Sequence, residues 1–300
     1  MTEDPHWPRA SVWLEAGGTP GGRSLGVVGV PLSLTSISQS GAHETPAAIR
    51  LALRRFTTYS AELDVSIEAL AVTDHGELDV AELMGDHAIA GVMAGLSGLP
   101  VSDLLVVLGG DNAVTRPVLR HLASDLSSVG LLTLDAHHDV REFHAGATNG
   151  TPIRGLIDDG LDPRHIAQIG IGDFTNSETY RRWCDEQGIT VVTASAARAE
   201  GVAACVRRCL DVLAKVCEWV YVDLDVDVLD AAFAPGCPGA RPGGFAPYEL
   251  HAAAREAVRH PAVRAIDIVE VDATADPLGL TVDAAALCLL SAAAGLAARP

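Results

Sequence analysis

Two carboxylates and an imidazole follow an apolar run at alternate positions near the middle of the chain. Within LLTLDAHHDVR (131–141), Asp135, His137 and Asp139 occupy every second position. A β-strand projects alternate side chains to the same face. A strand that persists here, or that ends in an extended turn, would bring the three groups together at its C-terminal tip. The pattern is typical of a metal site.

A second stretch repeats this arrangement with carboxylates alone. WVYVDLDVDVLD (219–230) places Asp223, Asp225 and Asp227 on one face of a predicted strand, with apolar residues between them. Carboxylates this close together repel one another and are costly to desolvate unless a cation neutralises them. Two such strand tips in one chain predict a metal site built mainly from oxygen ligands.

The donor types indicate the metal and the chemistry. A mixed set of carboxylates and imidazole suits Mn²⁺, and suits Zn²⁺ or Fe²⁺ less well. Two bridging carboxylates could hold two ions about 3.5 to 4 Å apart, and such sites activate water for hydrolysis. A calcium loop of the EF-hand type is excluded, because the Gly and Glu that it requires are Val228 and Ala234 when counted from Asp223. By strand parity His138 points to the opposite face, where we expect it to pack or to support the ligands.

The composition indicates one large acidic domain. The chain has 300 residues, of which 48% are hydrophobic, and a formal net charge of −18. An acidic chain without a Lys/Arg cluster argues against nucleic acid and anionic membranes as partners. The first ten residues lack the apolar segment of a signal peptide. The six cysteines form no CxxC pair, which indicates free thiols and a cytoplasmic location.

Apolar strands alternate with helices along most of the chain, which predicts a parallel sheet covered on both faces. Residues 1–24 are predicted to form an irregular arm, and residues 25–300 a single domain. The uncharged run 284–298 is shorter than the roughly 18 residues of a membrane span and predicts a buried helix. The predicted strands are 25–31, 67–73, 104–108, 129–134, 165–171, 190–193, 219–224 and 265–271. The predicted helices are 47–57, 80–96, 114–123, 152–158, 177–187, 201–216, 247–259 and 282–297.

The polar motifs stand where predicted strands end. In parallel sheets, sites form at the C-terminal ends of the strands. GGDN (109–112), DAHHD (135–139), DLDVD (223–227) and Glu270 all occupy such ends. We therefore expect them at one edge of the sheet.

The same motifs carry a family resemblance. GGDN, DAHHD, DLDVDVLDAAFAPG (223–236) and EVD (270–272), together with GAHETPAAIR (41–50), resemble those of the ureohydrolases, which include arginase, agmatinase and formimidoylglutamase. The resemblance runs from about residue 25 to residue 295. It implies a three-layer α/β/α arginase-like fold with a central, mostly parallel eight-stranded sheet, and a homo-oligomer, either trimer or hexamer.

Shorter segments resemble the formimidoylglutamase branch: NGTP (149–152), DVR (139–141), the loop 233–244 and GDFTN (172–176). That branch hydrolyses N-formimidoyl-L-glutamate to L-glutamate and formamide during histidine degradation. The alternative within the family is a guanidino-compound hydrolase that releases urea. An alternative of another class is a degenerate, non-catalytic homologue with one metal.

The resemblance also assigns the metal ligands. It implies that Asp135 and Asp225 bridge two Mn²⁺ ions. His137 and Asp227 would complete one site, and Asp139 would serve the other.

Further residues receive substrate roles by the same resemblance. Asp139 would carry a proton to the departing amine, and Glu270 would hold the cationic amidine. Arg141 could bind a substrate carboxylate in bidentate fashion. Asn149 and Asn176 are candidates for contacts with polar groups of the substrate.

One position departs from the family pattern. The family usually has His where this chain has Asn112. An amide oxygen is a weaker ligand than imidazole for Mn²⁺. The hypothesis is that the site formed with Asn112 binds its ion loosely or not at all.

Overall fold

One eight-stranded parallel sheet forms the centre of the molecule. The computed structural model describes residues 4, 6–144 and 146–300. Every pairing between neighbouring strands of this sheet is parallel. In spatial order the strands are β4 (Ala71–Glu77), β1 (Ser24–Val30), β5 (Leu104–Gly109), β10 (Val263–Val269), β9 (Trp219–Asp225), β6 (Val129–Leu134), β7 (Ile166–Ile171) and β8 (Thr190–Thr193).

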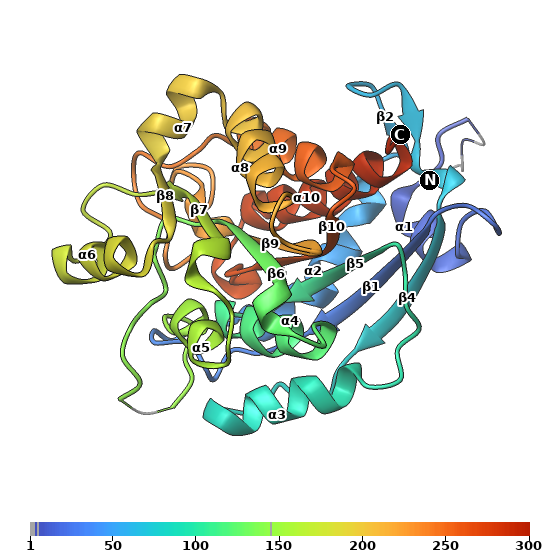
Figure 1. Ribbon diagram of the computed structural model, residues 1–300. Coiled ribbons are helices and arrows are strands. Elements are labelled where there is room, and N and C mark those ends of the chain that lie inside the picture. The colour runs from blue at the N-terminus through green and yellow to red at the C-terminus, as the bar shows by residue number, and fades with distance from the viewer. Residues whose placement is uncertain (1–3, 5, 145) are drawn as a thin grey trace.

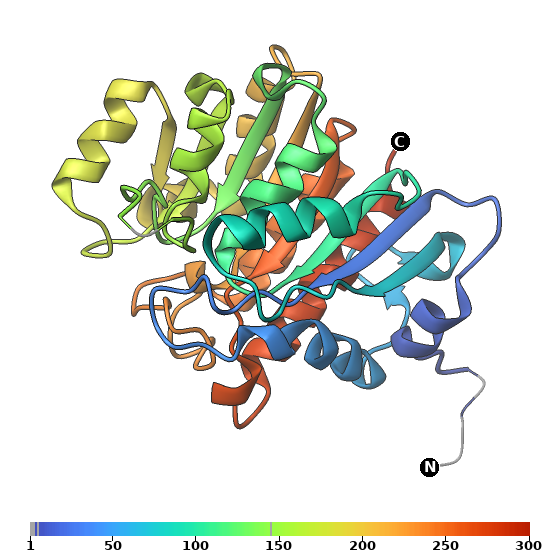
Figure 2. The ribbon, with the colours of Figure 1, turned by 90° about the horizontal axis from the view of Figure 1, so that it is seen from below.

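Helices cover both faces of this sheet, so the predicted three-layer α/β/α fold is confirmed (Figures 1 and 2). The inner strands are buried on both faces, which explains why they read as unbroken apolar runs. One layer holds α1 (Ala10–Ala16), α2 (Thr45–Ala52), α7 (Ala194–Glu200), α8 (Val202–Leu213), α9 (Pro247–Arg259) and α10 (Leu280–Ala297). The other layer holds α3 (Gly85–Leu96), α4 (Thr115–Leu122), α5 (Pro152–Asp158) and α6 (Glu178–Gln187).

The C-terminal helix α10 belongs to the core. By length and composition alone it could cross a membrane, but 67% of it is buried within the molecule. It packs against α9 and α2. The prediction of a buried helix is therefore confirmed.

The prediction of an irregular N-terminal arm is wrong for its central part. Residues 10–16 form α1, and Trp13 and Leu14 on this helix are buried in the core. Gly17 ends the helix in the left-handed conformation that glycine adopts readily. The apolar spacing and the glycine after it were available in the sequence as signals. Residues 1–3 and 5 lie outside the described residues.

The largest differences from the predicted boundaries concern three elements. The strand expected at 67–73 begins four residues later, as β4 (Ala71–Glu77), because Ile67–Ala69 form a 3₁₀ turn. Helix α3 starts only at Gly85, whose φ of +53° interrupts any helix arriving from residue 80. The helix expected at 47–57 ends earlier, as α2 (Thr45–Ala52), and a 3₁₀ turn at Leu53–Arg55 follows it.

Three further elements, one helix and two short strands, were not predicted. Helix α7 begins after Thr193, whose side chain accepts a hydrogen bond from the Ala196 amide and so caps the helix. A short antiparallel pair joins β2 (Tyr59–Ser60) and β3 (Val65–Ser66).

Candidate functional site

Four strand ends that are distant in sequence lie side by side. Strands β5, β10, β9 and β6 are consecutive neighbours in the sheet. Each is followed by one of the polar motifs, so all four motifs meet at the C-terminal edge, where parallel sheets form their sites. The predicted convergence is confirmed.

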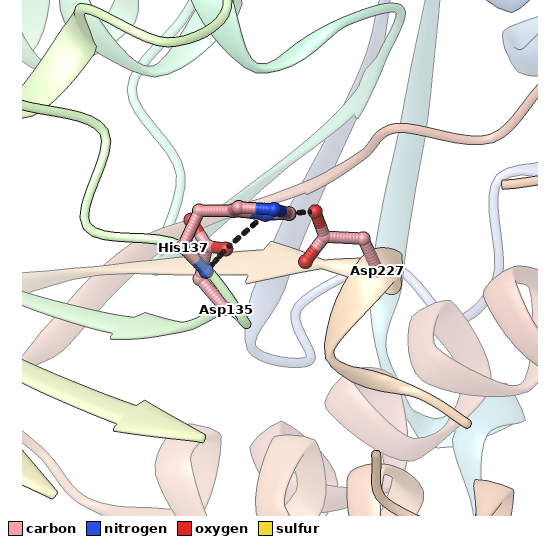
Figure 3. A group of neighbouring side chains, drawn as sticks. All are labelled: Asp135, His137 and Asp227. Carbon is pink, nitrogen blue, oxygen red and sulfur yellow. Dashed lines mark hydrogen bonds and ion pairs between the residues drawn. The ribbon is translucent and has the colours of Figure 1, made fainter. Parts of the chain in front are cut away.

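The first group of donors is Asp135, His137 and Asp227, and one ligand atom from each lies within 4.8 Å of the others (Figure 3). The His137 Nδ1 atom is 2.6 Å from Asp227 Oδ2 and 3.7 Å from Asp135 Oδ1. The amide of Ala136 donates to Asp227 Oδ1 at 3.0 Å. The backbone after β6 therefore holds a carboxylate that comes from the turn after β9.

The second group is Asp135, Asp139 and Asp225, with donor atoms again within 4.8 Å of one another. Asp135 belongs to both groups, as a bridging ligand must. Asp225 belongs to this second group, so its predicted bridging role stays a prediction. Five predicted ligands are thus brought together.

Turns, and not an extended strand, aim these side chains. Strand β6 ends at Leu134, and Asp139 has a left-handed backbone with φ +51°. Strand β9 ends at Asp225, whose side chain accepts from the Asp227 amide and caps a 3₁₀ turn, Val226–Val228. Strained backbone of this kind is often found at functional sites. The predicted alternation therefore fails beyond the strand ends, although the donors still converge.

Asp223 does not join either group, contrary to the idea that all three aspartates of its stretch face one site. It is paired in register with Asp267 on β10 and with Thr133 on β6. All three are buried, and neither oxygen of Asp223 has a hydrogen-bond partner among the described residues. Burial raises the pKa of the Asp223 carboxyl well above its usual value, and the neighbouring Asp267 adds to this. Asp223 thus lies beneath the site.

The electrostatics of both groups favour a cation. Burial raises the pKa of Asp135 to about 7, and the nearby Asp227 carboxylate contributes to the increase. Burial also raises the pKa values of Asp139 and Asp225 well above normal. For His137, burial lowers the pKa but the attraction of Asp227 outweighs it, and the pKa rises to about 12. Buried carboxylates that resist ionisation beside a strongly proton-attracting imidazole fit a divalent metal, which would replace those protons.

Glu270 is positioned with one oxygen free. Its backbone has φ +64°. Its Oε1 accepts hydrogen bonds from the backbone amide of Asn112 at 2.8 Å and from the side-chain Nδ2 of Asn149 at 2.9 Å. Burial raises its pKa to about 8, with a further increase from Asp111. Since Oε1 already has two donors, Oε2 is the oxygen available to a cationic ligand.

Asn112 lies at the site with its amide nitrogen turned toward it. Asn112 Nδ2 donates to Asp139 Oδ2 at 2.7 Å, whereas Oδ1 is 2.8 Å from the Thr115 hydroxyl. The same hydroxyl is 2.8 Å from Asp267 Oδ2. A hydroxyl has one proton and can donate to only one of these two acceptors. Rotation of the amide by 180° would give Thr115 a donor and turn the Asn112 oxygen toward Asp139.

The amides of the two predicted substrate-binding asparagines are used within the protein. Asn149 donates to Glu270 and accepts from the Ile37 amide at 3.0 Å. Asn176 accepts from the His138 amide at 3.0 Å and donates to the Ala136 carbonyl at 2.9 Å. Both line the cavity, and both hold site segments in place. Their substrate contacts stay predictions.

His138 lies outside both donor groups and has a supporting position, although the strand whose parity was used to predict this ends at Leu134. It is buried, and its Nδ1 lies 2.7 Å from Gln168 Oε1, while Gln168 Nε2 donates to the His138 carbonyl. Burial lowers the pKa of His138. Gln168, a polar residue within strand β7, was missed by the sequence analysis; its signal is an amide inside an apolar run.

A cavity of about 350 Å³ opens above the donors. Arg141 lies at this cavity, as predicted. Arg241 also lines it and was missed; it stands in the long loop after the second aspartate stretch. Among the described residues that line the cavity, the carboxylates are Asp139, Asp225, Asp227 and Glu270.

Comparison with known proteins agrees with this geometry. The formimidoylglutamase of Halalkalibacterium halodurans is 38% identical over 272 residues, which cover 89% of this chain and 85% of that protein. The crystal structure of formimidoylglutamase from Bacillus subtilis matches with a TM-score of 0.90 at 33% identity, covering 100% of this chain and 95% of that one. The structure of Trypanosoma cruzi formiminoglutamase with Mn²⁺₂ has the same fold, with a TM-score of 0.86 at 20% identity over 98% of this chain and 100% of that one.

The arginase family matches residues 23–295, a range that includes all four strand ends and both donor groups. Agreement between the match, the sheet order and the ligand geometry leads to one conclusion: this chain belongs to the arginase family.

Proposed function

We propose that this chain hydrolyses N-formimidoyl-L-glutamate to L-glutamate and formamide. One observation carries the assignment: the cavity has a carboxylate floor and an arginine at its mouth. Arg141 is exposed at the cavity and has no carboxylate partner among the described residues. Its backbone amide donates to the Gly150 carbonyl at 2.9 Å, which anchors the residue. The similarity to formimidoylglutamases supports the same substrate.

Two Mn²⁺ ions held by Asp135, His137, Asp227, Asp139 and Asp225 would polarise the substrate and activate a water molecule. The donors themselves are placed before any ion binds, because backbone amides fix Asp135, Asp225 and Asp227. Preorganised charge of this kind needs little rearrangement during the reaction. The second group depends on Asn112, and we propose that its ion is the weaker of the two.

Glu270 orients the amidine. Its free Oε2 can accept charge-assisted hydrogen bonds from the formamidinium N–H groups. A bound cation also favours the ionised form of this carboxyl, whose pKa is otherwise about 8. Asp139, which belongs to the second donor group, would take a proton from the attacking water and carry it to the departing amine. Water adds to the formimidoyl carbon, the bond from that carbon to the glutamate nitrogen breaks, and formamide and glutamate leave.

The guanidino alternative fits the cavity less well. Agmatine carries a free ammonium, which requires a carboxylate or another acceptor at the mouth. Among the described lining residues, every carboxylate belongs to the metal groups or is Glu270. Arg141 would repel such an ammonium. The non-catalytic alternative is also disfavoured, because the two donor groups and Glu270 are intact.

Location and assembly are further parts of the proposal. The six cysteines are all free thiols and buried, which supports a reducing compartment such as the cytoplasm. The family resemblance supports a homo-oligomer, trimer or hexamer. A small amidine is the proposed partner, and neither nucleic acid nor membrane is expected.

A substrate panel on Mn²⁺-loaded protein tests the function. The panel contains formimidoylglutamate, agmatine, guanidinobutyrate and arginine, with formamide and urea both measured. Formamide from the first compound is expected. Urea from a guanidino compound would overturn the substrate but keep the chemistry. No product from any of the four, also with Asn112→His, would favour the binding-protein alternative.

A further inference from the structure

Two arginines, and not one, stand at the mouth of the cavity. Arg141 comes from the loop after β6, and Arg241 from the loop after β9. Both are exposed. Many arginines of this acidic chain pair with carboxylates, such as Arg50 with Asp74 and Arg116 with Asp159. Within the described residues, Arg141 and Arg241 have no such partner, although carboxylates crowd the floor below them.

Arg241 is held in a fixed position by the backbone. Its Nη1 atom donates to the carbonyls of Pro238 at 2.9 Å, Gly239 at 3.2 Å and Ala240 at 2.9 Å. A guanidinium has five N–H groups, so Nε and Nη2 are still available. These two nitrogens present the edge that binds a carboxylate in bidentate fashion.

The loop that carries Arg241 is itself anchored. The Asp230 carboxylate accepts from the Gly243 amide at 2.7 Å, and the Phe245 amide donates to the Val228 carbonyl at 2.8 Å. Phe245 is fully buried. Little conformational freedom would therefore be lost when Arg241 binds a ligand, which makes the contact more effective.

The side chain of Arg141 also has a defined position. It packs over Gly150, where a Cβ atom would lie 2.8 Å from Arg141 Cδ and 3.1 Å from Nε. Any larger residue at position 150 would displace the guanidinium. Gly150 thus makes room for this arginine beside the cavity.

We propose that Arg141 and Arg241 each bind one carboxylate of a dicarboxylic amidine, so that the enzyme selects substrates by their number of carboxylates. This inference rests on the proposed function and names its specificity determinants. Formimidoylglutamate has one amidinium and two carboxylates, which match one Glu270 and two arginines. Guanidinobutyrate has one carboxylate and would leave one arginine unpaired.

Substrates that lack one carboxylate test the pairing. N-Formimidoyl-L-norvaline keeps the α-carboxylate, and 4-formamidinobutanoate keeps only the side-chain carboxylate. Arg141→Gln and Arg241→Gln are each assayed on these two compounds and on formimidoylglutamate. With the full substrate, each variant is expected to lose about 10- to 100-fold in kcat/KM. For each variant, the loss in kcat/KM should vanish with the truncated substrate that lacks the carboxylate bound by the replaced arginine. The truncated substrate that shows no loss should therefore be a different one for Arg141→Gln and for Arg241→Gln.

Arg198→Gln is the matched control for loop structure. Arg198 donates to the carbonyls of Gly243 and Gly244 in the same loop but does not line the catalytic cavity. This variant should show the same small change on all three substrates. Equal losses of an arginine variant on all three, or no loss on any, would overturn the two-arginine inference. Formamide release by the unmodified enzyme tests the proposed function separately; if formimidoylglutamate yields none, both proposals fail.

Discussion

The floor and the mouth of the cavity are built in opposite ways. The floor carboxylates Asp135, Asp225, Asp227 and Glu270 are at most 5% exposed, and the ends of adjacent strands hold them. The mouth arginines are exposed and stand on loops. Buried like charges must be fixed by a scaffold and neutralised by a cation. Charges that bind a substrate from solvent can reside on loops, where substitutions leave the sheet intact. We therefore expect the floor to carry the chemistry and the mouth to select the substrate.

The largest effect is expected in the floor. Asp225→Asn removes one carboxylate from the second donor group, so kcat should fall on the order of 1,000-fold and Mn²⁺ affinity should drop. Formamide release and titration calorimetry with Mn²⁺ measure the two effects. Asp211→Asn, on the exposed side of α8, is the control and should change neither. Unchanged binding of two ions by Asp225→Asn would break the assignment of this group.

A change at the mouth should affect substrate affinity and leave the metal untouched. Arg141→Gln is expected to raise KM for formimidoylglutamate by about 10-fold or more, with little change in kcat, because the lost contact is made equally in the ground and transition states. Mn²⁺ affinity, measured by calorimetry, should equal that of the unmodified protein. A lower kcat with altered metal binding would instead show that mouth and floor are coupled.

The floor should also make the metal-free protein sensitive to pH. Asp135 and Glu270 have folded pKa values of about 7 and about 8, against ordinary values of 3.8 and 4.5. The folded state therefore binds more protons than the unfolded state, and its stability falls as the pH rises through this range. Thermal unfolding in EDTA should show a Tm lower by on the order of 5 °C at pH 8 than at pH 5.

Mn²⁺ is the control for this pH effect. An ion neutralises the same carboxylates, so the loaded protein should lose most of the difference between the two pH values. If the metal-free protein were instead more stable at pH 8, the floor carboxylates would not be the repelling group described above.

The smallest effect is expected from Thr115, which contacts the Asn112 side chain on the side away from Asp139. Thr115→Val removes the hydroxyl that would accept a hydrogen bond from Asn112 when its oxygen faces a metal. Supporting contacts of this kind are worth about 10-fold or more in metal affinity, and only one of the two ions should weaken. Electron paramagnetic resonance of bound Mn²⁺ would measure the loss of this one ion. The matched control is Thr133→Val, a buried threonine whose hydroxyl has no partner among the described residues. Equal Mn²⁺ binding by both variants would remove Thr115 from this role.

Much of the floor was predictable because its signals are local. Motifs at the ends of apolar runs identified Asp135, His137, Asp139, Asp225 and Asp227, and their convergence is confirmed. The mouth was only half predictable. Arg141 follows directly after a motif, whereas Arg241 stands in a loop that no periodicity describes.

Local patterns also misled where turns replace strands. Strand parity predicted one common face for Asp223, Asp225 and Asp227, but a 3₁₀ turn redirects Asp227 while Asp223 stays below the site in the sheet. For the N-terminal arm, the Gly- and Pro-rich composition led to the prediction of an irregular segment, although the short apolar spacing at residues 10–16 forms α1.

The amino-acid sequence alone established the alternation of strands and helices and the residue types at the strand ends; the family resemblance added the departure at Asn112. These features depend on neighbours in the chain, which periodicity and motifs record. The folded structure was needed to show that β5, β10, β9 and β6 are adjacent, that His137 pairs with Asp227, and that Arg241 reaches the same cavity as Arg141. Strand order depends on packing between segments far apart in the chain, and no local pattern encodes it.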